Sequence, residues 1–170
     1  TNAHSYSGKI KSKELRIGKL LAKGNKFGNA AFDIELKGLK YRNNQPESYI
    51  KGVISSLEYN HYEYQNITLD GQYRPGSFNG RLALDDENGR INIEGNFNTA
   101  QKTPDFNLRA IMRNFRPNAL RLTDKYQNTD ISLNLTADFS GHSIDDMQGG
   151  IQLDSLSVRN PMENLSYFMP

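Results

Sequence analysis

Residues 67–97 read ITLDGQYRPGSFNGRLALDDENGRINIEGNF, and this stretch decides the fold. Apolar and polar residues alternate along it, which is the pattern of β-strands with one apolar face and one solvated face. The alternation is interrupted at Pro75-Gly76 and at Asn88-Gly89, and both dipeptides are typical of tight turns. The stretch therefore predicts three consecutive antiparallel strands joined by hairpin loops.

Glycine returns at a fixed place in this alternation, on the same face as the aliphatic and aromatic residues. It does so at five positions, each with an apolar residue two places before and two places after the glycine: Gly52, Gly71, Gly80, Gly95 and Gly149. A glycine inside a strand weakens it, so a regular recurrence marks bending or the close approach of another backbone. Two roles are open: relief of crowding beside bulky neighbours, and curving the sheet into an apolar trough.

The turns also predict which residues lie opposite each other. Asn60-His61, between Tyr59 and Tyr62, adds a third hairpin loop and so a four-stranded meander over residues 50–99. Counting outward from the three turns predicts three rows on the apolar face: Ile54, Ile67, Leu84 and Ile93; Gly52, Leu69, Leu82 and Gly95; Ile50, Gly71, Gly80 and Phe97. The same count predicts a polar row on the other face: Lys51, Asp70, Arg81 and Asn96. A slip of one residue would destroy this separation of faces.

The remaining sequence continues the strand pattern in both directions. Residues 1–46 predict N-terminal strands, with a short helical turn over Gly18 to Ala22. Residues 105–158 predict further strands, with a short helix near 118–126 that begins after Pro117. We therefore expect residues 1–170 to form a single all-β unit: an antiparallel meander of hairpin repeats that makes a curved, open, U-shaped sheet with an apolar inner face.

The composition excludes several functional classes. Hydrophobic residues make up 36% of the 170, the mean hydropathy is −0.73, and there is no cysteine, which rules out disulfides and thiolate chemistry. The net charge is +2 and the charges are interspersed, so no basic stripe indicates nucleic acid binding. No apolar run is long enough for a transmembrane segment. We expect the chain to be a piece of a longer protein.

No arrangement of residues indicates catalysis. The histidines, His4, His61 and His142, fall in a tail and in turns and lack the spacing of metal ligands. The acidic run 85–89 lacks the ligand spacing of a calcium loop and fits a hairpin tip. There is no nucleophile elbow and no phosphate-binding glycine loop. We expect no catalytic residues, no metal and no cofactor.

The tyrosines Tyr59, Tyr62 and Tyr64 form a cluster of their own. The alternation predicts that they lie, with Leu57, on the face opposite the glycines. They are either cross-strand aromatic pairs that stabilise a hairpin end or a patch that stacks on a sugar or another partner.

Three segments resemble a known family. The first is Leu15–Leu21 followed by Phe32–Gly38, the second is Tyr-x-Asn-Ile-x-Leu-x-Gly-x-Tyr at 64–73, and the third is Phe-Ser-Gly-x-x-Ile-Asp-Asp-Met-x-Gly at 139–149. All three segments are similar to TamB/AsmA-like repeats in the form seen in Bacteroidetes. The conserved TamB C-terminal domain is not evident, so the resemblance implies an interior segment.

The resemblance carries expectations about the parent protein. It implies a very large protein of the Gram-negative envelope, anchored in the inner membrane by an N-terminal helix and extending through the periplasm. Such proteins form a U-shaped groove implicated in phospholipid transport toward the outer membrane, in outer-membrane protein assembly, or in both. The resemblance further implies that an Omp85-type barrel of the outer membrane binds other parts of the parent protein.

We therefore expect the apolar face to be the inside of a half-pipe that contacts lipid acyl chains and catalyses no reaction. The expected lipid-contacting residues are Ile50, Ile54, Ile67, Leu69, Tyr73, Phe78, Leu82, Leu84, Ile91, Ile93, Phe97, Phe106, Leu108, Leu133, Leu135, Ile151 and Leu153. Two alternatives are open: a closed β-barrel that binds a small hydrophobic ligand, and an adhesive or carbohydrate-binding β-domain that uses the tyrosine cluster.

Overall fold

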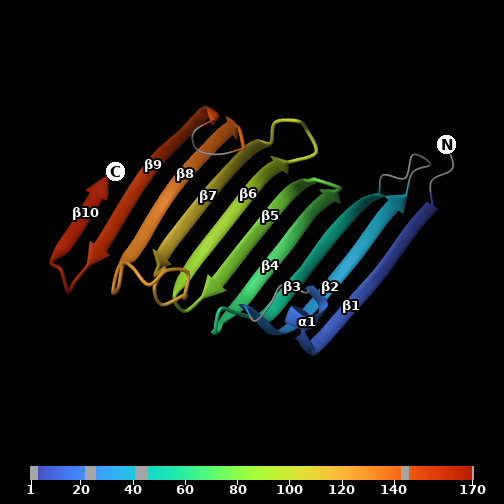
Figure 1. Cartoon of the computed structure of the whole chain (residues 1–170), viewed down its shortest axis with the longest axis horizontal. Helices are drawn as coiled ribbons and strands as arrows, with labels where there is room; N and C mark the ends of the chain where they lie inside the picture. Colours follow the sequence, from blue (N-terminus) through green and yellow to red (C-terminus); the bar gives the residue numbers. More distant parts are fainter. Residues whose placement is uncertain (1–3, 22–25, 41–45, 143–145, 170) are drawn as a thin grey trace.

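The chain forms one sheet of ten antiparallel strands in chain order (Figure 1). The computed structural model describes residues 4–21, 26–40, 46–142 and 146–169. The strands are β1 (His4–Arg16), β2 (Phe27–Lys40), β3 (Pro46–Tyr59), β4 (Tyr62–Arg74), β5 (Ser77–Asp86), β6 (Gly89–Asn98), β7 (Asp105–Phe115), β8 (Asp130–Ser140), β9 (Gln148–Asn160) and β10 (Leu165–Met169). A short helix, α1 (Ile17–Leu21), joins β1 to β2. The predicted all-β meander is confirmed.

The sheet is open and consists of a single layer. Among the described residues, β1 pairs only with β2 and β10 only with β9, so the sheet is not closed into a barrel, and the closed-barrel alternative is wrong. The accessible surface is 11861 Å². A compact protein of this mass exposes about 8,500 Å². The excess is the surface that a second layer would otherwise cover.

Two of the three predicted hairpin turns are confirmed, and the third is wrong by one residue, which shifts the β5–β6 register by two. Asn60-His61 joins β3 to β4 with φ angles of 52° and 62°, and Pro75-Gly76 joins β4 to β5. The β5–β6 loop is Glu87-Asn88, so Leu84 lies opposite Ile91 and not Ile93.

The Asp86 side chain explains the shifted β5–β6 turn. Its carboxylate accepts a hydrogen bond from the Asn88 backbone N–H at 2.9 Å, which closes the loop one residue earlier than the Asn-Gly pair suggests. A shift of two residues leaves every side chain on its predicted face.

The two predicted helical segments have different outcomes. The predicted turn over Gly18 to Ala22 appears as α1, although Ala22 lies outside the described residues. The helix predicted near 118–126 is wrong, because the segment forms successive turns. The Leu120 N–H donates to the Arg116 carbonyl at 3.0 Å, but Arg121 has a φ of 56°, which ends the helical path after one turn.

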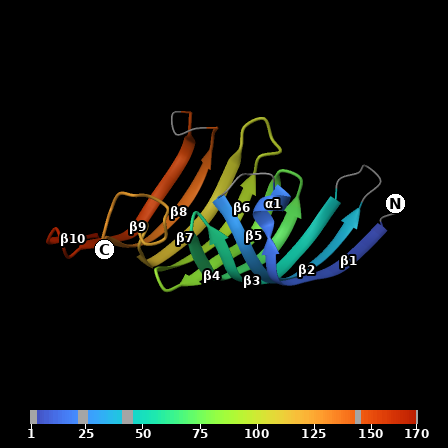
Figure 2. The same cartoon turned by 60° about the horizontal axis from the view of Figure 1, so that its bottom comes forward.

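The strands bend, so the sheet is a trough. Asn66 in β4 and Asn114 in β7 have positive φ angles of 53° and 49°. The β3–β4 ladder is interrupted between Ile67 and Gln65, and the β7–β8 register shifts between Met112 and Phe115. Figure 2 shows the bent strands, with α1 and the loop between β7 and β8 on the concave side.

Beyond the bend at Asn66, Leu57 and the three tyrosines pack with Ile67 and Leu84. Their predicted placement on the face opposite the glycines is therefore wrong. The register of β3 shifts between Ile54 and Ser56, and Asn66 in β4 has a positive φ, so the alternation reverses on both strands.

Candidate functional site: an apolar trough

One continuous apolar row crosses nine strands of the concave face. It consists of directly opposed residues, one from each of β1 to β9: Ile10, Ile34, Gly52, Leu69, Leu82, Ile93, Ala110, Leu135 and Leu153. No position in this row is polar. Because opposed side chains on one face of a sheet are neighbours, the row forms an uninterrupted apolar strip perpendicular to the strands.

A parallel row carries most of the recurring glycines. Its members are Gly8, Leu36, Ile50, Gly71, Gly80, Gly95, Leu108, Ala137 and Ile151. A Cβ atom at Gly80 would lie 2.5 Å from Gly71 Cα, and one at Gly95 would lie 2.6 Å from Leu108 Cα. Side chains are therefore excluded here by the backbone of the neighbouring strand. The predicted crowding by bulky partners is wrong for Gly80, which lies opposite Gly71 and Gly95.

Two further rows complete the trough. On one side lies a row rich in aromatic residues: Tyr6, Gly38, Ser48, Tyr73, Phe78, Phe97, Phe106, Phe139 and Gly149. Phe106 stacks on Phe139 with ring centroids 4.8 Å apart. On the other side lies an almost wholly aliphatic row: Ser12, Phe32, Ile54, Ile67, Leu84, Ile91, Met112, Leu133 and Leu156.

Much of this apolar surface is open to solvent. Exposure is 39% for Leu82, 40% for Phe97 and 54% for Ile151. Such a large contiguous apolar surface is unusual on a soluble protein and marks a site of interaction. Leu84 is an exception, since it is only 7% exposed and belongs to the small core under the β7–β8 loop.

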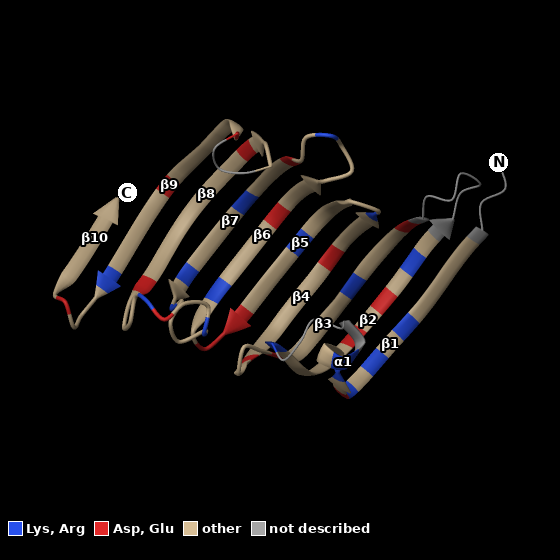
Figure 3. Ribbon diagram, in the orientation of Figure 1, with Lys and Arg blue, Asp and Glu red and all other residues tan. Residues whose placement is uncertain are grey.

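The opposite face is polar and ordered by charge. One row alternates in sign across seven strands: Lys9, Glu35, Lys51, Asp70, Arg81, Glu94 and Arg109 (Figure 3). Arg81 lies opposite Glu94, whereas the sequence predicts Asn96, because of the shifted β5–β6 turn.

Neighbouring groups on this face shift the pKa of several side chains. Hydrogen bonds from Lys9 and Lys11 lower the pKa of Asp33, and the Tyr49 hydroxyl lowers that of Asp70. These groups are solvated and paired, so they hold the register of the strands.

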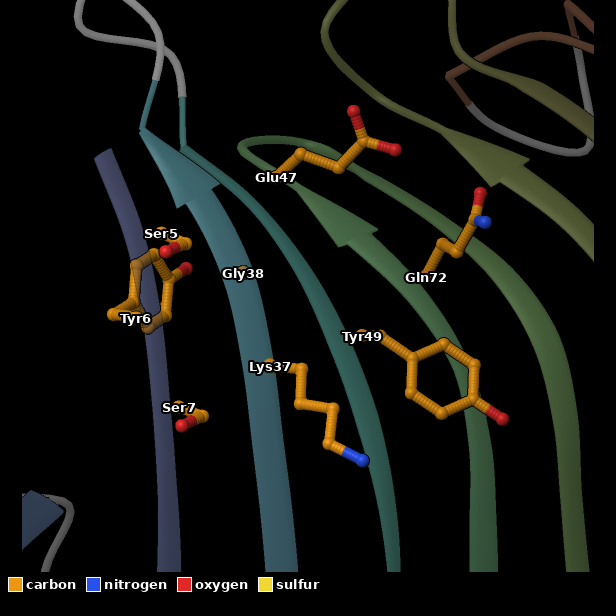
Figure 4. Close-up of a pocket in the computed structure, with 8 residues that line it drawn as sticks. All are labelled: Ser5, Tyr6, Ser7, Lys37, Gly38, Glu47, Tyr49 and Gln72. Atoms are coloured by element: carbon orange, nitrogen blue, oxygen red, sulfur yellow. The ribbon is translucent and has the colours of Figure 1, made fainter. Parts of the chain in front are cut away.

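The structure also contains a hollow near the N-terminal strands. It is a shallow depression of about 460 Å³ at the β1–β4 end of the sheet (Figure 4). It is lined by Ser5, Tyr6, Ser7, Lys37, Gly38, Glu47, Tyr49 and Gln72. Its phenol groups are engaged elsewhere, since Tyr49 donates to Asp70, and Tyr6 lies within hydrogen-bonding distance of Ser48, 2.5 Å between the oxygens. In the part of the chain that the structure describes, no group of side chains could hold a metal ion.

The structure places all seventeen predicted lipid-contacting residues and all five predicted glycines in the four rows. The prediction missed the contributions of β1 and β2, among them Ile10, Ile34 and Leu36. Alternation along Phe32–Leu36 indicated a strand, but no short turn fixed its register to β3. Ala110 and Ala137, which are 5% and 3% exposed, were missed because alanine is a weak marker of a buried face.

The tyrosine cluster is packed and does not form an open patch. Tyr64 is 8% exposed, and its hydroxyl donates to the Leu120 carbonyl at 2.6 Å. The Tyr62 ring meets that of Tyr64 edge-on at 4.8 Å, and its hydroxyl donates to Asp86 at 2.5 Å. This packing favours the cross-strand aromatic interpretation over sugar stacking.

Comparison with family models, with curated proteins and with solved structures finds no match to this chain. No helix among the described residues has the length and apolarity needed to cross a membrane.

Proposed function

We propose that this chain is a non-catalytic segment of a lipid-carrying groove, in which the concave face of the sheet contacts phospholipid acyl chains. In agreement with the resemblance to TamB/AsmA-like repeats, the parent protein would be an inner-membrane-anchored protein of the periplasm. It would carry phospholipid between the inner and outer membranes, or support outer-membrane protein assembly, or both.

One observation carries the proposal: the apolar row that runs without a polar residue from Ile10 in β1 to Leu153 in β9. An acyl chain requires an apolar surface that is long, continuous and accessible from one side. The exposed Leu82 and Phe97 supply such a surface. Burying apolar surface contributes about 25 cal/mol per Å² of favourable free energy, so the binding of a long acyl chain along this row would be favourable.

The experiment compares two variants that carry the same charges on opposite faces. The test variant is Leu69→Asp, Leu82→Lys and Ile93→Asp, three directly opposed positions of the trough. The control is Thr68→Asp, Ala83→Lys and Asn92→Asp, the opposed positions next to them on the polar face. The alternating signs avoid like-charge repulsion across the strands.

Each variant is mixed with vesicles of phosphatidylethanolamine and phosphatidylglycerol that contain a phospholipid with a photoactivatable acyl chain. The trough variant should lose crosslinked lipid, while the polar-face variant retains it, with circular dichroism showing β-structure in both. Equal crosslinking of the two folded variants would overturn the proposed function.

A further inference from the structure

The loop between β7 and β8, residues 116–129, lies across one side of the trough, and we call it the strap. Its Leu120 is fully buried against Tyr64 and Leu84. Ile67, Ile91 and Phe115 pack around the same cluster. Leu84, Ile67 and Ile91 belong to the aliphatic row of the trough, so Leu120 covers apolar surface that elsewhere in that row is open to a ligand.

The strap is fixed in its middle and at its β7 end. Toward β4, the Tyr64 hydroxyl donates to the Leu120 carbonyl at 2.6 Å and the Asn60 amide donates to the Arg121 carbonyl at 2.7 Å. Near β7, the Arg116 N–H donates to the Asn88 carbonyl at 2.9 Å, and Arg116 pairs with Asp130 at 2.5 Å. The strap thus reaches from β7 past the β5–β6 turn to the β3–β4 turn.

The β8 end of the strap is held by hydrogen bonds from β9. Asn160, at the end of β9 and 3% exposed, donates its amide to the Gln127 carbonyl at 3.1 Å and to the Thr129 hydroxyl at 3.2 Å. Tyr64 and Asn160, two of the residues that bond to the strap, are themselves buried, which holds the segment in one position.

We infer that the strap is a fixed side wall that sets where an acyl chain can lie, with Leu120 as its specificity-determining residue. This inference rests on the proposed function. Leu120 fills the apolar position above Leu84 and Ile91, so lipid is confined to the central, glycine and aromatic rows in the section from β4 to β7. Leu122, two residues further along the strap, is 50% exposed and takes no part in this wall.

The absence of tryptophan from the chain provides a direct test. Phe115→Trp places a fluorescent reporter under the strap, and Phe97→Trp places one in the open aromatic row, where Phe97 is 40% exposed. Each protein is loaded with a phospholipid brominated in its acyl chains, which quenches tryptophan only at close range. We expect quenching of the reporter at position 97 and none at position 115.

Leu120→Ala in the Phe115→Trp background removes the side chain that fills the wall, and quenching at position 115 should then appear. Leu122→Ala is the matched control and should leave position 115 unquenched. Tyr64→Phe, which removes the hydroxyl that holds the Leu120 carbonyl, is a milder second variant should Leu120→Ala fail to fold; it should give partial quenching.

The outcomes separate the two proposals. Quenching at both positions with the strap intact would overturn the side wall and leave the proposed function standing. An absence of quenching at both position 97 and position 115 would overturn the proposed function. Quenching at position 97 alone, unchanged by Leu120→Ala or Tyr64→Phe, would overturn the role of Leu120.

Discussion

Gly80 shows at the scale of a single residue how the trough is built. A Cβ atom there would lie 2.5 Å from Gly71 Cα and closer still to the Asp70 carbonyl oxygen. Gly80→Ala should therefore lower the free energy of unfolding by about 1–3 kcal/mol, the usual range for overpacking. Gly8 is a matched control in the same row, because a Cβ there meets nothing within 4 Å. Gly8→Ala should change stability by less than about 0.5 kcal/mol. Equal effects in urea titrations would refute this account of the glycines.

Tyr62 gives a prediction on pH. Burial, followed by the hydrogen bond to Asp86, raises the pKa of Tyr62 to about 12. The pKa of an unfolded tyrosine is about 10, so the unfolded chain loses this proton first as the pH rises. The contribution of Tyr62 is therefore full below about pH 10 and is lost between about pH 10 and 12. Urea midpoints measured across this range should fall less steeply in Tyr62→Phe than in the unmodified protein; an identical decline would contradict the assignment.

At the scale of the elements, the alternating charges on the polar face act across neighbouring strands. The alternation ends at Arg109, whose partner on β8 is the exposed Thr136. Thr136→Glu would extend the pattern by one strand and should stabilise the fold by about 0.2–1 kcal/mol. Thr136→Lys should destabilise it by a similar amount, and both effects should shrink in high salt. The measurement is the free energy of unfolding at low and high ionic strength. The same sign of effect for Glu and Lys would show that charge is not the cause.

The elements also show which parts of the molecule could be predicted from sequence. Two-residue turns such as Asn60-His61 fix the register directly, so the meander from β3 to β5 and its apolar face could be derived. The β5–β6 turn was misjudged because the Asp86 side chain competes with the Asn-Gly preference. The strap could not be predicted, since the burial of Leu120 depends on Tyr64 and Asn60, which lie 56 and more residues away. The placement of the tyrosines failed for a related reason: Asn66 adopts a positive φ that no local pattern announced.

At the scale of the whole molecule, the defining property is a large apolar face without a second layer over most of its area. The sheet spans ten strands, and its accessible surface of 11861 Å² is well above the value of about 8,500 Å² expected for a compact protein of this size. Under the proposed function, a groove open along one side would let acyl chains enter and slide without unfolding any element. The opposite face is polar, and its paired charges are hydrated.

The most direct test of the central claim is to map photocrosslinks from a phospholipid with a diazirine in its acyl chain at the resolution of single residues. Across β4, β5 and β6 the lipid should label Leu69, Leu82 and Ile93 and spare the adjacent Asp70, Arg81 and Glu94, because successive residues of a strand lie on opposite faces. Labelling confined to the concave face is the result that a lipid-carrying trough predicts. Labelling spread equally over both faces, or absent from the trough, would contradict it.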